Sequence, residues 1–124
     1  MGVTGRIEEN LIIFSLEGEN TVDQAKKIFS SVFLSKNLGE NFPVLVDARN
    51  SQRNRDLSEV AGFAEALLHY REKIGGKCAL VISEQRKNPL GLERSLAAFS
   101  LREKIQFGLF FELNSAMEWL RKDV

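Results

Sequence analysis

The clearest feature of the sequence is a pair of short, uninterrupted apolar runs, one within residues 43–46 and one within 77–82. Runs of this length are typical of strands that are buried on both faces of a mostly parallel sheet. We expect the first run to form the central strand, which ends at Asp47, and the second to form another buried strand. Residues 107–111 are largely apolar and predict a last strand.

The N-terminal segment has a weaker pattern, in which apolar and polar residues alternate over residues 3–7. A stronger apolar run begins at Leu11 and continues to about Glu17. Between them, the dipeptide at 9–10 favours a tight turn. The pattern therefore predicts a hairpin at one edge of the sheet.

Four other stretches repeat their apolar residues at helical spacing, and each begins with a capping pattern. The first helix is expected to end near Ser35, the second at the glycine pair 75–76, and the third near Lys104. The expected starts are Thr21 with Gln24, Asp56 with Glu59, Asn88 before Pro89, and Ser115 with Glu118.

Strands that alternate with helices after an initial hairpin predict a mixed sheet, because crossovers of this length favour right-handed parallel pairing. The expected fold class is therefore α/β, with a five-stranded sheet that is parallel except at its hairpin edge and with about four helices. A chain of 124 residues is long enough for one domain, which we expect to span residues 1–124.

The composition narrows the classes of function. Seventeen basic and seventeen acidic residues give no net charge, which argues against a general affinity for nucleic acid or for an anionic membrane. One cysteine and one histidine are too few for an internal disulfide or a structural zinc site. Residues 1–9 lack the apolar core of a signal peptide, and no apolar run is long enough to cross a bilayer. We therefore expect a cytoplasmic protein without a membrane span, a metal or a cofactor.

Basic residues follow two of the expected strands, at what parallel pairing predicts to be one edge of the sheet. Ligands of open α/β sheets bind where strands end and helices begin, so this edge is the candidate site for a phosphate or carboxylate group. The alternative is a solvated loop whose charges contribute little. No glycine pattern of a Rossmann or P-loop site follows any expected strand. The residues of this edge are Arg49, Arg53, Arg55, Arg86 and Lys87, with Asp56 at the start of the second helix.

Ser58 is expected in the first turn of the second helix, where backbone N–H groups and the positive end of the helix dipole would stabilise an added phosphate. The alternative interpretation is an ordinary serine beside a capping aspartate. Asp47 lacks the acidic neighbours that a magnesium site needs, so we expect it to hydrogen-bond to the arginine loop.

Three further residues have structural interpretations. Cys78 lies inside an expected strand, which favours a buried apolar residue over a nucleophile. His69 is late in the second helix and far from any nucleophile motif, so we expect a surface or boundary residue. Trp119 shares a helical stripe with Ala116 and Leu120 and is expected to anchor the core.

Several segments in the second half carry a family likeness. Residues 76–81 read Gly-Lys-Cys-Ala-Leu-Val, a helical segment follows at 89–99, and the chain closes on an aromatic pair at 110–111 and Ala-Met-Glu-Trp-Leu at 116–120. These segments resemble the fourth strand, the next helix and the closing Ala-x-x-Trp-Leu helix of the SpoIIAA-like family. That family belongs to the STAS superfamily, which includes bacterial anti-sigma factor antagonists.

In those antagonists, the helix after the central strand begins with Asp-Ser-Ser-Gly, and the second serine is a phosphorylation switch. The similar residues in this chain are Asp56, Leu57, Ser58 and Glu59. The aspartate and one serine match, whereas the first serine and the glycine do not. The resemblance therefore implies that Ser58 occupies the position of the switch serine, although the motif around it is only partly kept.

The resemblance and the basic edge together predict a non-enzymatic regulatory module that binds a protein partner through the edge around residues 49–59. The alternative is a domain that binds a small ligand, an anionic metabolite or a lipid, at the same edge. An apolar cavity would favour a lipid, whereas a shallow arginine-lined cleft would favour an anion. The third hypothesis, an enzyme, is the weakest, because the sequence has no visible nucleophile–base pair or metal cluster.

Overall fold

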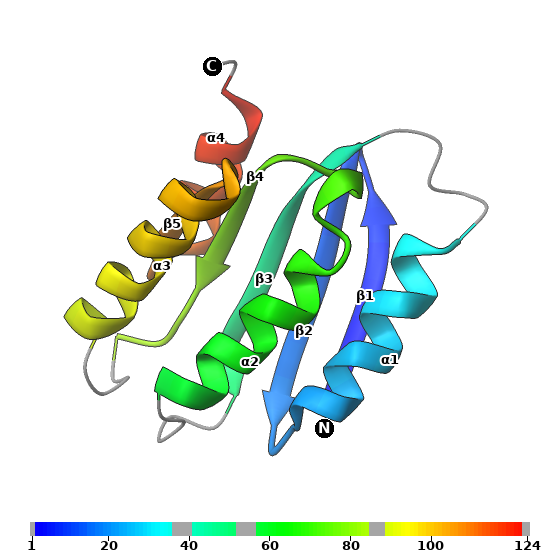
Figure 1. The fold of residues 1–124 in the computed structure, drawn as a ribbon, viewed down its shortest axis with the longest axis horizontal. Helices are drawn as coiled ribbons and strands as arrows, with labels where there is room; N and C mark the ends of the chain where they lie inside the picture. Colours follow the sequence, from blue (N-terminus) through cyan, green and yellow to red (C-terminus); the bar gives the residue numbers. More distant parts are fainter. Residues whose placement is uncertain (1, 36–40, 52–56, 85–88, 123–124) are drawn as a thin grey trace.

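In the computed structural model, the chain is described over residues 2–35, 41–51, 57–84 and 89–122. These residues form an α/β fold with a five-stranded sheet and four α-helices (Figure 1). The elements in chain order are β1 Gly2–Glu8, β2 Leu11–Gly18, α1 Val22–Phe33, β3 Phe42–Ser51, α2 Leu57–Leu68, the 3-10 helix η1 Arg71–Lys73, β4 Ile74–Val81, α3 Pro89–Glu103, β5 Gln106–Phe110 and α4 Leu113–Arg121.

The sheet has the strand order β1-β2-β3-β4-β5, so β3 is its central strand. Strands β1 and β2 pair antiparallel, whereas the other neighbouring strands pair parallel. The hairpin turn holds Glu9 and Asn10 at φ values of 50° and 65°, and two central residues with positive φ match the twist of a tight hairpin. The predicted mixed sheet with a hairpin edge is confirmed.

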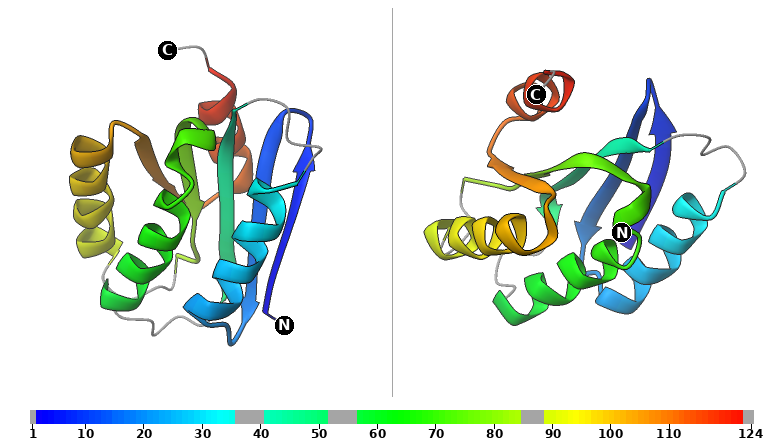
Figure 2. Two further views of the ribbon diagram at one scale, coloured as in Figure 1. Left: turned by 45° about the vertical axis from the view of Figure 1, so that its right-hand side comes forward. Right: turned by 45° about the horizontal axis from the view of Figure 1, so that its top comes forward.

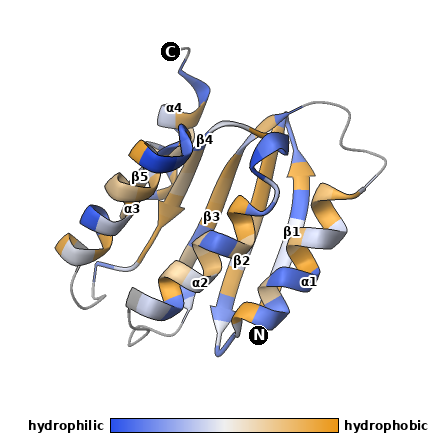
Figure 3. Cartoon of the chain, in the orientation of Figure 1, coloured by the Kyte–Doolittle hydropathy of each residue, from blue (hydrophilic) through white to orange (hydrophobic). Residues whose placement is uncertain are grey.

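The sheet separates two unequal layers of helices. Helices α1, α2 and α3 cover one face, and α4 lies on the opposite face (Figure 2). In β3, Val44 and Val46 belong to the larger apolar core beneath α1 and α2, whereas Leu45 belongs to the core beneath α4. This alternation buries the middle of β3 on both faces, and Figure 3 shows the strand in the hydropathy colours.

Helix α1 begins as its sequence predicts. The Thr21 hydroxyl oxygen accepts a hydrogen bond from the Gln24 backbone N–H at 3.2 Å, and the Gln24 side-chain oxygen accepts one from the Thr21 N–H at 2.9 Å. This reciprocal pair is a capping box, which satisfies two N–H groups that the helix leaves without partners. Helix α3 likewise begins at Pro89, while the expected caps Asp56 and Asn88 lie outside the described residues.

Strand β3 is longer than the sequence suggests. It continues to Ser51, so the expected end at Asp47 is wrong and Arg49 lies in a strand rather than in a loop. The C-terminal half of β2 supplies the pairing partner, with Glu17 opposite Asn50. The register between β2 and β3 shifts just before this pair, which accommodates an extra residue in β3.

The glycine pair 75–76 does not end the second helix, contrary to our expectation. Helix α2 ends at Leu68, whose carbonyl oxygen accepts a 2.9 Å hydrogen bond from the Arg71 guanidinium, and both glycines lie inside β4. A Cβ atom on Gly75 would lie 2.8–2.9 Å from backbone atoms of residues 41–43, and Gly76 has a φ of 84°. The pair therefore permits a close approach and an irregular register between β3 and β4.

Helix α4 differs from the expected terminal helix at its start. It begins at Leu113 with Glu112 as an N-cap that makes no side-chain cap hydrogen bond, so the predicted capping pair of Ser115 and Glu118 is wrong. Ala116 and Leu120 are buried against the sheet, whereas Trp119 is only partly buried beside them. Trp119 thus lies at the border of this core and does not form its centre.

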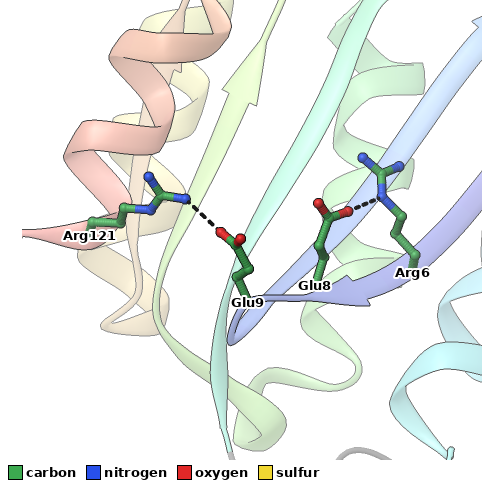
Figure 4. Close-up of polar contacts among 4 residues, drawn as sticks. All are labelled: Arg6, Glu8, Glu9 and Arg121. Carbon is green, nitrogen blue, oxygen red and sulfur yellow. Dashed lines mark hydrogen bonds and ion pairs between the residues drawn. The ribbon is translucent and has the colours of Figure 1, made fainter.

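Two exposed ion pairs lie around the hairpin turn and α4 (Figure 4). The Arg121 guanidinium lies 3.2 Å from the Glu9 carboxylate and links α4 to the β1–β2 turn. The Arg6 guanidinium lies 2.8 Å from the Glu8 carboxylate on β1. All four side chains are more than half exposed, so water screens both pairs and each contributes little to stability.

Candidate functional site: an apolar cavity beneath α2 and α3

An apolar cavity of about 90 Å³ lies between the sheet and helices α2 and α3. Val46, Cys78 and Leu80 contribute to its sheet side. Phe63 and Leu67 of α2 and Leu96 of α3 contribute to its helix side. The volume is several times that of one water molecule, and apolar walls offer water few hydrogen-bond partners.

Small side chains leave this space open. Ala48 on β3 and Ala64 on α2 both line the cavity, at positions where a leucine or phenylalanine would fill it. In the same core, Phe14 packs edge to face on Phe29, which also lines the cavity, with ring centroids 4.6 Å apart. The cavity therefore borders a well-filled core and follows from the choice of alanine at specific positions.

Two serines bring polar side chains to the cavity lining in the part of the chain that the structure describes, Ser51 and Ser83. Ser51 is the last residue of β3, and Ser83 follows β4. Because β3 and β4 are parallel, both serines lie toward the C-terminal edge of the sheet. The Asn20 side chain, itself buried, donates a 3.0 Å hydrogen bond to the Ser51 hydroxyl oxygen.

Cys78 is a buried residue of the cavity wall, as its place in a strand predicts. Burial raises the pKa of its thiol to about 12, because an apolar environment disfavours the charged thiolate. A thiol with this pKa is almost entirely protonated at neutral pH and is a poor nucleophile. Cys78 therefore acts in the cavity as a small apolar side chain.

Arg49 is already engaged by a neighbouring carboxylate. Its guanidinium donates hydrogen bonds of 2.9 and 2.8 Å to the two carboxylate oxygens of Asp47, and its backbone N–H donates a third at 3.2 Å. These bonds hold the pKa of Asp47 below its ordinary value and raise that of Arg49. The expected hydrogen bond between Asp47 and an arginine is confirmed.

Asp47 lies on the far side of the sheet from the cavity. Asp47 pairs with Ser15 across β2 and β3, and the pair two residues earlier is Ile13 with Leu45. Residues two apart in a strand point to the same face, and both Ile13 and Leu45 belong to the core beneath α4. Arg49, the bidentate partner of Asp47, is not part of the cavity lining. A role for Arg49 in anion binding stays a prediction.

Ser58 is exposed and lies in the first turn of α2, as predicted. Its phosphorylation stays a prediction. His69 directly follows α2 and is exposed, with its ring centroid 4.9 Å from that of Tyr70, which agrees with a surface residue. The remaining residues of the predicted edge, Arg53, Arg55, Asp56, Arg86 and Lys87, lie outside the described residues.

Sequence reasoning did not find the cavity. The sequence feature that could have indicated the cavity is an alanine among larger apolar residues, Ala48 in the strand and Ala64 in the helix. Alanine is also favoured in helices for its helix propensity, so this feature is not specific. The pairing of Asn20 with Ser51 joins positions 31 residues apart and depends on the extension of β3. Neither feature has a local sequence signature.

The described residues hold no cluster of three or more histidine, cysteine or acidic side chains arranged to bind a metal ion. None of the helices that the structure describes is both long enough and apolar enough to cross a membrane.

The comparisons with known proteins agree with the fold. No protein-family model matches the sequence, and no curated protein matches it. Among solved structures, the chain is similar to an uncharacterized protein of the DUF3478 family with a SpoIIAA-like fold, from Shewanella loihica PV-4. The TM-score is 0.64 at 15% sequence identity, and the match covers 96% of this chain and 94% of that one. The chain therefore has a SpoIIAA-like fold, as the resemblance of its sequence predicts.

Proposed function

We propose that the chain is a non-enzymatic binding module that takes up a small, largely apolar ligand of the lipid class in the cavity beneath α2 and α3. The observation that carries the proposal is the cavity itself, whose described lining is apolar apart from two serines. The sequence left open a lipid or an anion as small-ligand alternatives, and a cavity of this lining favours the lipid.

The energetics of the cavity support an apolar occupant. Each Å² of apolar surface that a ligand removes from water contributes about 25 cal/mol, and the cavity walls gain dispersion contacts that they lack when it is empty. A charged ligand would lose its hydration without gaining an opposite charge from the described lining. Binding should therefore grow with the apolar area of the ligand until the cavity is full.

A titration with N-phenyl-1-naphthylamine, a neutral fluorophore whose emission rises in apolar surroundings, tests this function. Wild type should give a saturable increase in emission. The variant Ala64→Leu fills the cavity from α2 and should lose it, whereas Ala97→Leu, on the exposed surface of α3, should bind as wild type does.

Circular dichroism would confirm that Ala64→Leu is folded, and Ala48→Leu fills the same cavity from the sheet side. Unchanged fluorophore binding in both folded filling variants would contradict the proposal, because the probe would then be bound elsewhere.

A second candidate is the predicted capture of a protein partner at the edge where α2 and α3 begin. The specific observation in its favour is that Ser58 is exposed in the first turn of α2, while Leu90 in the first turn of α3 is 56% exposed to solvent. A phosphate on Ser58 would be stabilised at the start of α2 and would add negative charge to the exposed first turn of that helix.

Partner capture by Ser58→Asp and Ser58→Ala proteins would test this candidate. Ser58→Asp should lose a partner that Ser58→Ala retains, and mass spectrometry of the protein from its native cells should find Ser58 phosphate. Equal capture by both variants, together with no phosphate at Ser58, would exclude the switch.

A further inference from the structure

Ser51 places a hydrogen-bond donor in a cavity that is otherwise almost wholly apolar. It is 9% exposed, ends β3 and lines the cavity. Asn20, which is 3% exposed, contacts it from the segment between β2 and α1. Buried polar groups normally make all their hydrogen bonds within the protein, so a hydrogen bond that this pair does not make is available to a ligand.

The protons of this pair can be counted. The Asn20 side-chain nitrogen donates to the Gly18 carbonyl oxygen at 3.1 Å and to the Ser51 hydroxyl oxygen at 3.0 Å. A carbonyl oxygen can only accept, so the contact with Gly18 fixes which end of the Asn20 amide is the nitrogen. Both of its hydrogens are thereby used, and one of them occupies a lone pair of the Ser51 oxygen.

Ser51 is consequently an acceptor toward Asn20 and retains its own hydroxyl proton. Within the described residues, that hydroxyl donates no hydrogen bond to another group. Ser83, the other serine of the lining, already has a partner. A buried donor without an acceptor is costly, and a ligand atom that accepts from it recovers that cost on binding.

We propose that Ser51 determines the specificity of the cavity by donating a hydrogen bond to a carbonyl oxygen on an otherwise apolar ligand, with Asn20 as the residue that positions it. The ligand class is a ketone, aldehyde or ester with a hydrocarbon chain. This inference rests on the proposed function. Ligands whose polar end can only donate, such as ammonium groups, have no matching acceptor at Ser51.

The test compares two ligands of nearly the same shape, nonan-2-one and 2-methylnon-1-ene, in which a methylene group replaces the carbonyl oxygen. Their dissociation constants follow from displacement of N-phenyl-1-naphthylamine. Ser51→Ala should weaken binding of the ketone about 5–10-fold and change that of the alkene less than about twofold, as expected for loss of one hydrogen bond. Ser51→Thr keeps the hydroxyl and should retain most of the ketone affinity.

Ser83→Ala is the matched control, because it removes the other hydroxyl of the lining and should leave the ratio of the two dissociation constants unchanged. A measurement on wild type alone avoids any change in folding. The side-chain amide resonances of Asn20 should shift when the ketone is added and should move much less with the alkene.

These measurements distinguish failure of the cavity as a ligand site from failure of Ser51 as its hydrogen-bond donor. If wild type binds neither ligand nor the fluorophore, the cavity function and the role of Ser51 both fall. If wild type and Ser51→Ala bind both ligands with the same ratio of affinities, the cavity function stands and the role of Ser51 is overturned. A loss of ketone affinity confined to Ser83→Ala would assign the donor to Ser83 and likewise overturn the proposal.

Discussion

The side-chain ammonium group of Lys77 in β4 donates a 2.8 Å hydrogen bond to the backbone carbonyl oxygen of Trp119 in α4. A second hydrogen bond, of 2.9 Å, reaches the carbonyl oxygen of Lys122. The last carbonyl groups of a helix lack partners within the helix, and a cation there also interacts favourably with the helix dipole. Lys77, only 7% exposed, therefore holds the C-terminal end of α4 against the sheet.

Replacing Lys77 by methionine keeps the apolar stem and removes both hydrogen bonds. We expect the free energy of unfolding to fall by about 2 kcal/mol, because hydrogen bonds to a charged group are worth more than neutral ones and the carbonyl groups are left without that donor. Urea denaturation measures the change. Lys26→Met, at an exposed position of α1, is the control and should stay within about 0.5 kcal/mol of wild type. Similar midpoints for all three proteins would show that α4 is held by apolar packing alone.

The relative burial of Trp119 and Leu120 predicts which of them anchors α4. Trp119 is partly buried, and its ring centroid lies 5.5 Å from that of Phe110 and 5.0 Å from Lys77 Nζ. Leu120, in contrast, is buried in the core. Leu120→Ala should cost about 3 kcal/mol through lost burial and a new cavity, and Trp119→Ala should cost about 2 kcal/mol because part of its ring is already in water. A urea midpoint for Trp119→Ala that lies well below the midpoint for Leu120→Ala would contradict this order.

Local patterns of the sequence were sufficient to predict most of the fold. The reciprocal hydrogen bonds of Thr21 and Gln24 depend on residues three apart, and Pro89 marks the start of α3 by its own geometry. The apolar run at 43–46 predicted a central strand, because only a strand with neighbours on both sides and helices on both faces is buried so completely.

The errors arose where distant segments decide the local conformation. The polar residues after Asp47 are typical of a loop, but pairing with the end of β2 extends β3 to Ser51. Gly75-Gly76 is typical of a helix end, but in the structure these residues lie in β4 and allow it to approach the start of β3 closely. The cavity was missed for the same reason, since an unfilled volume depends on side chains from several elements at once.

The two glycines of β4 should respond differently to alanine. At Gly75 a methyl group would lie 2.8–2.9 Å from backbone atoms of residues 41–43, which cannot move without displacing β3. Gly75→Ala should therefore cost about 2 kcal/mol or more. Gly76 has open space around its Cβ position, and its φ of 84° alone should make Gly76→Ala cost about 1 kcal/mol. Equal urea midpoints for the two variants would refute the close approach at Gly75.

The contact between Asp47 and Arg49 predicts a pH-dependent contribution to stability. Two hydrogen bonds from the Arg49 guanidinium are the main reason that the pKa of Asp47 lies below its ordinary value of 3.8. The folded state therefore holds fewer protons than the unfolded state in the interval between the lowered and the ordinary pKa. The stabilisation is fully present above about 3.8 and is lost as the pH falls through the lowered pKa.

Arg49→Gln should reduce the free energy of unfolding by about 1 kcal/mol at pH 7, a modest value because the Arg49 side chain is 38% exposed and water screens the pair. Below the ordinary pKa of Asp47 the difference between the two proteins should shrink, since wild type loses the same interaction by protonation. Urea denaturation from pH 7 down to pH 2.5 measures this convergence, with Arg94→Gln on the exposed surface of α3 as the control. A difference between wild type and Arg49→Gln that stays constant over this range would mean that Arg49 stabilises the fold through its aliphatic stem, with no contribution from the charge of Asp47.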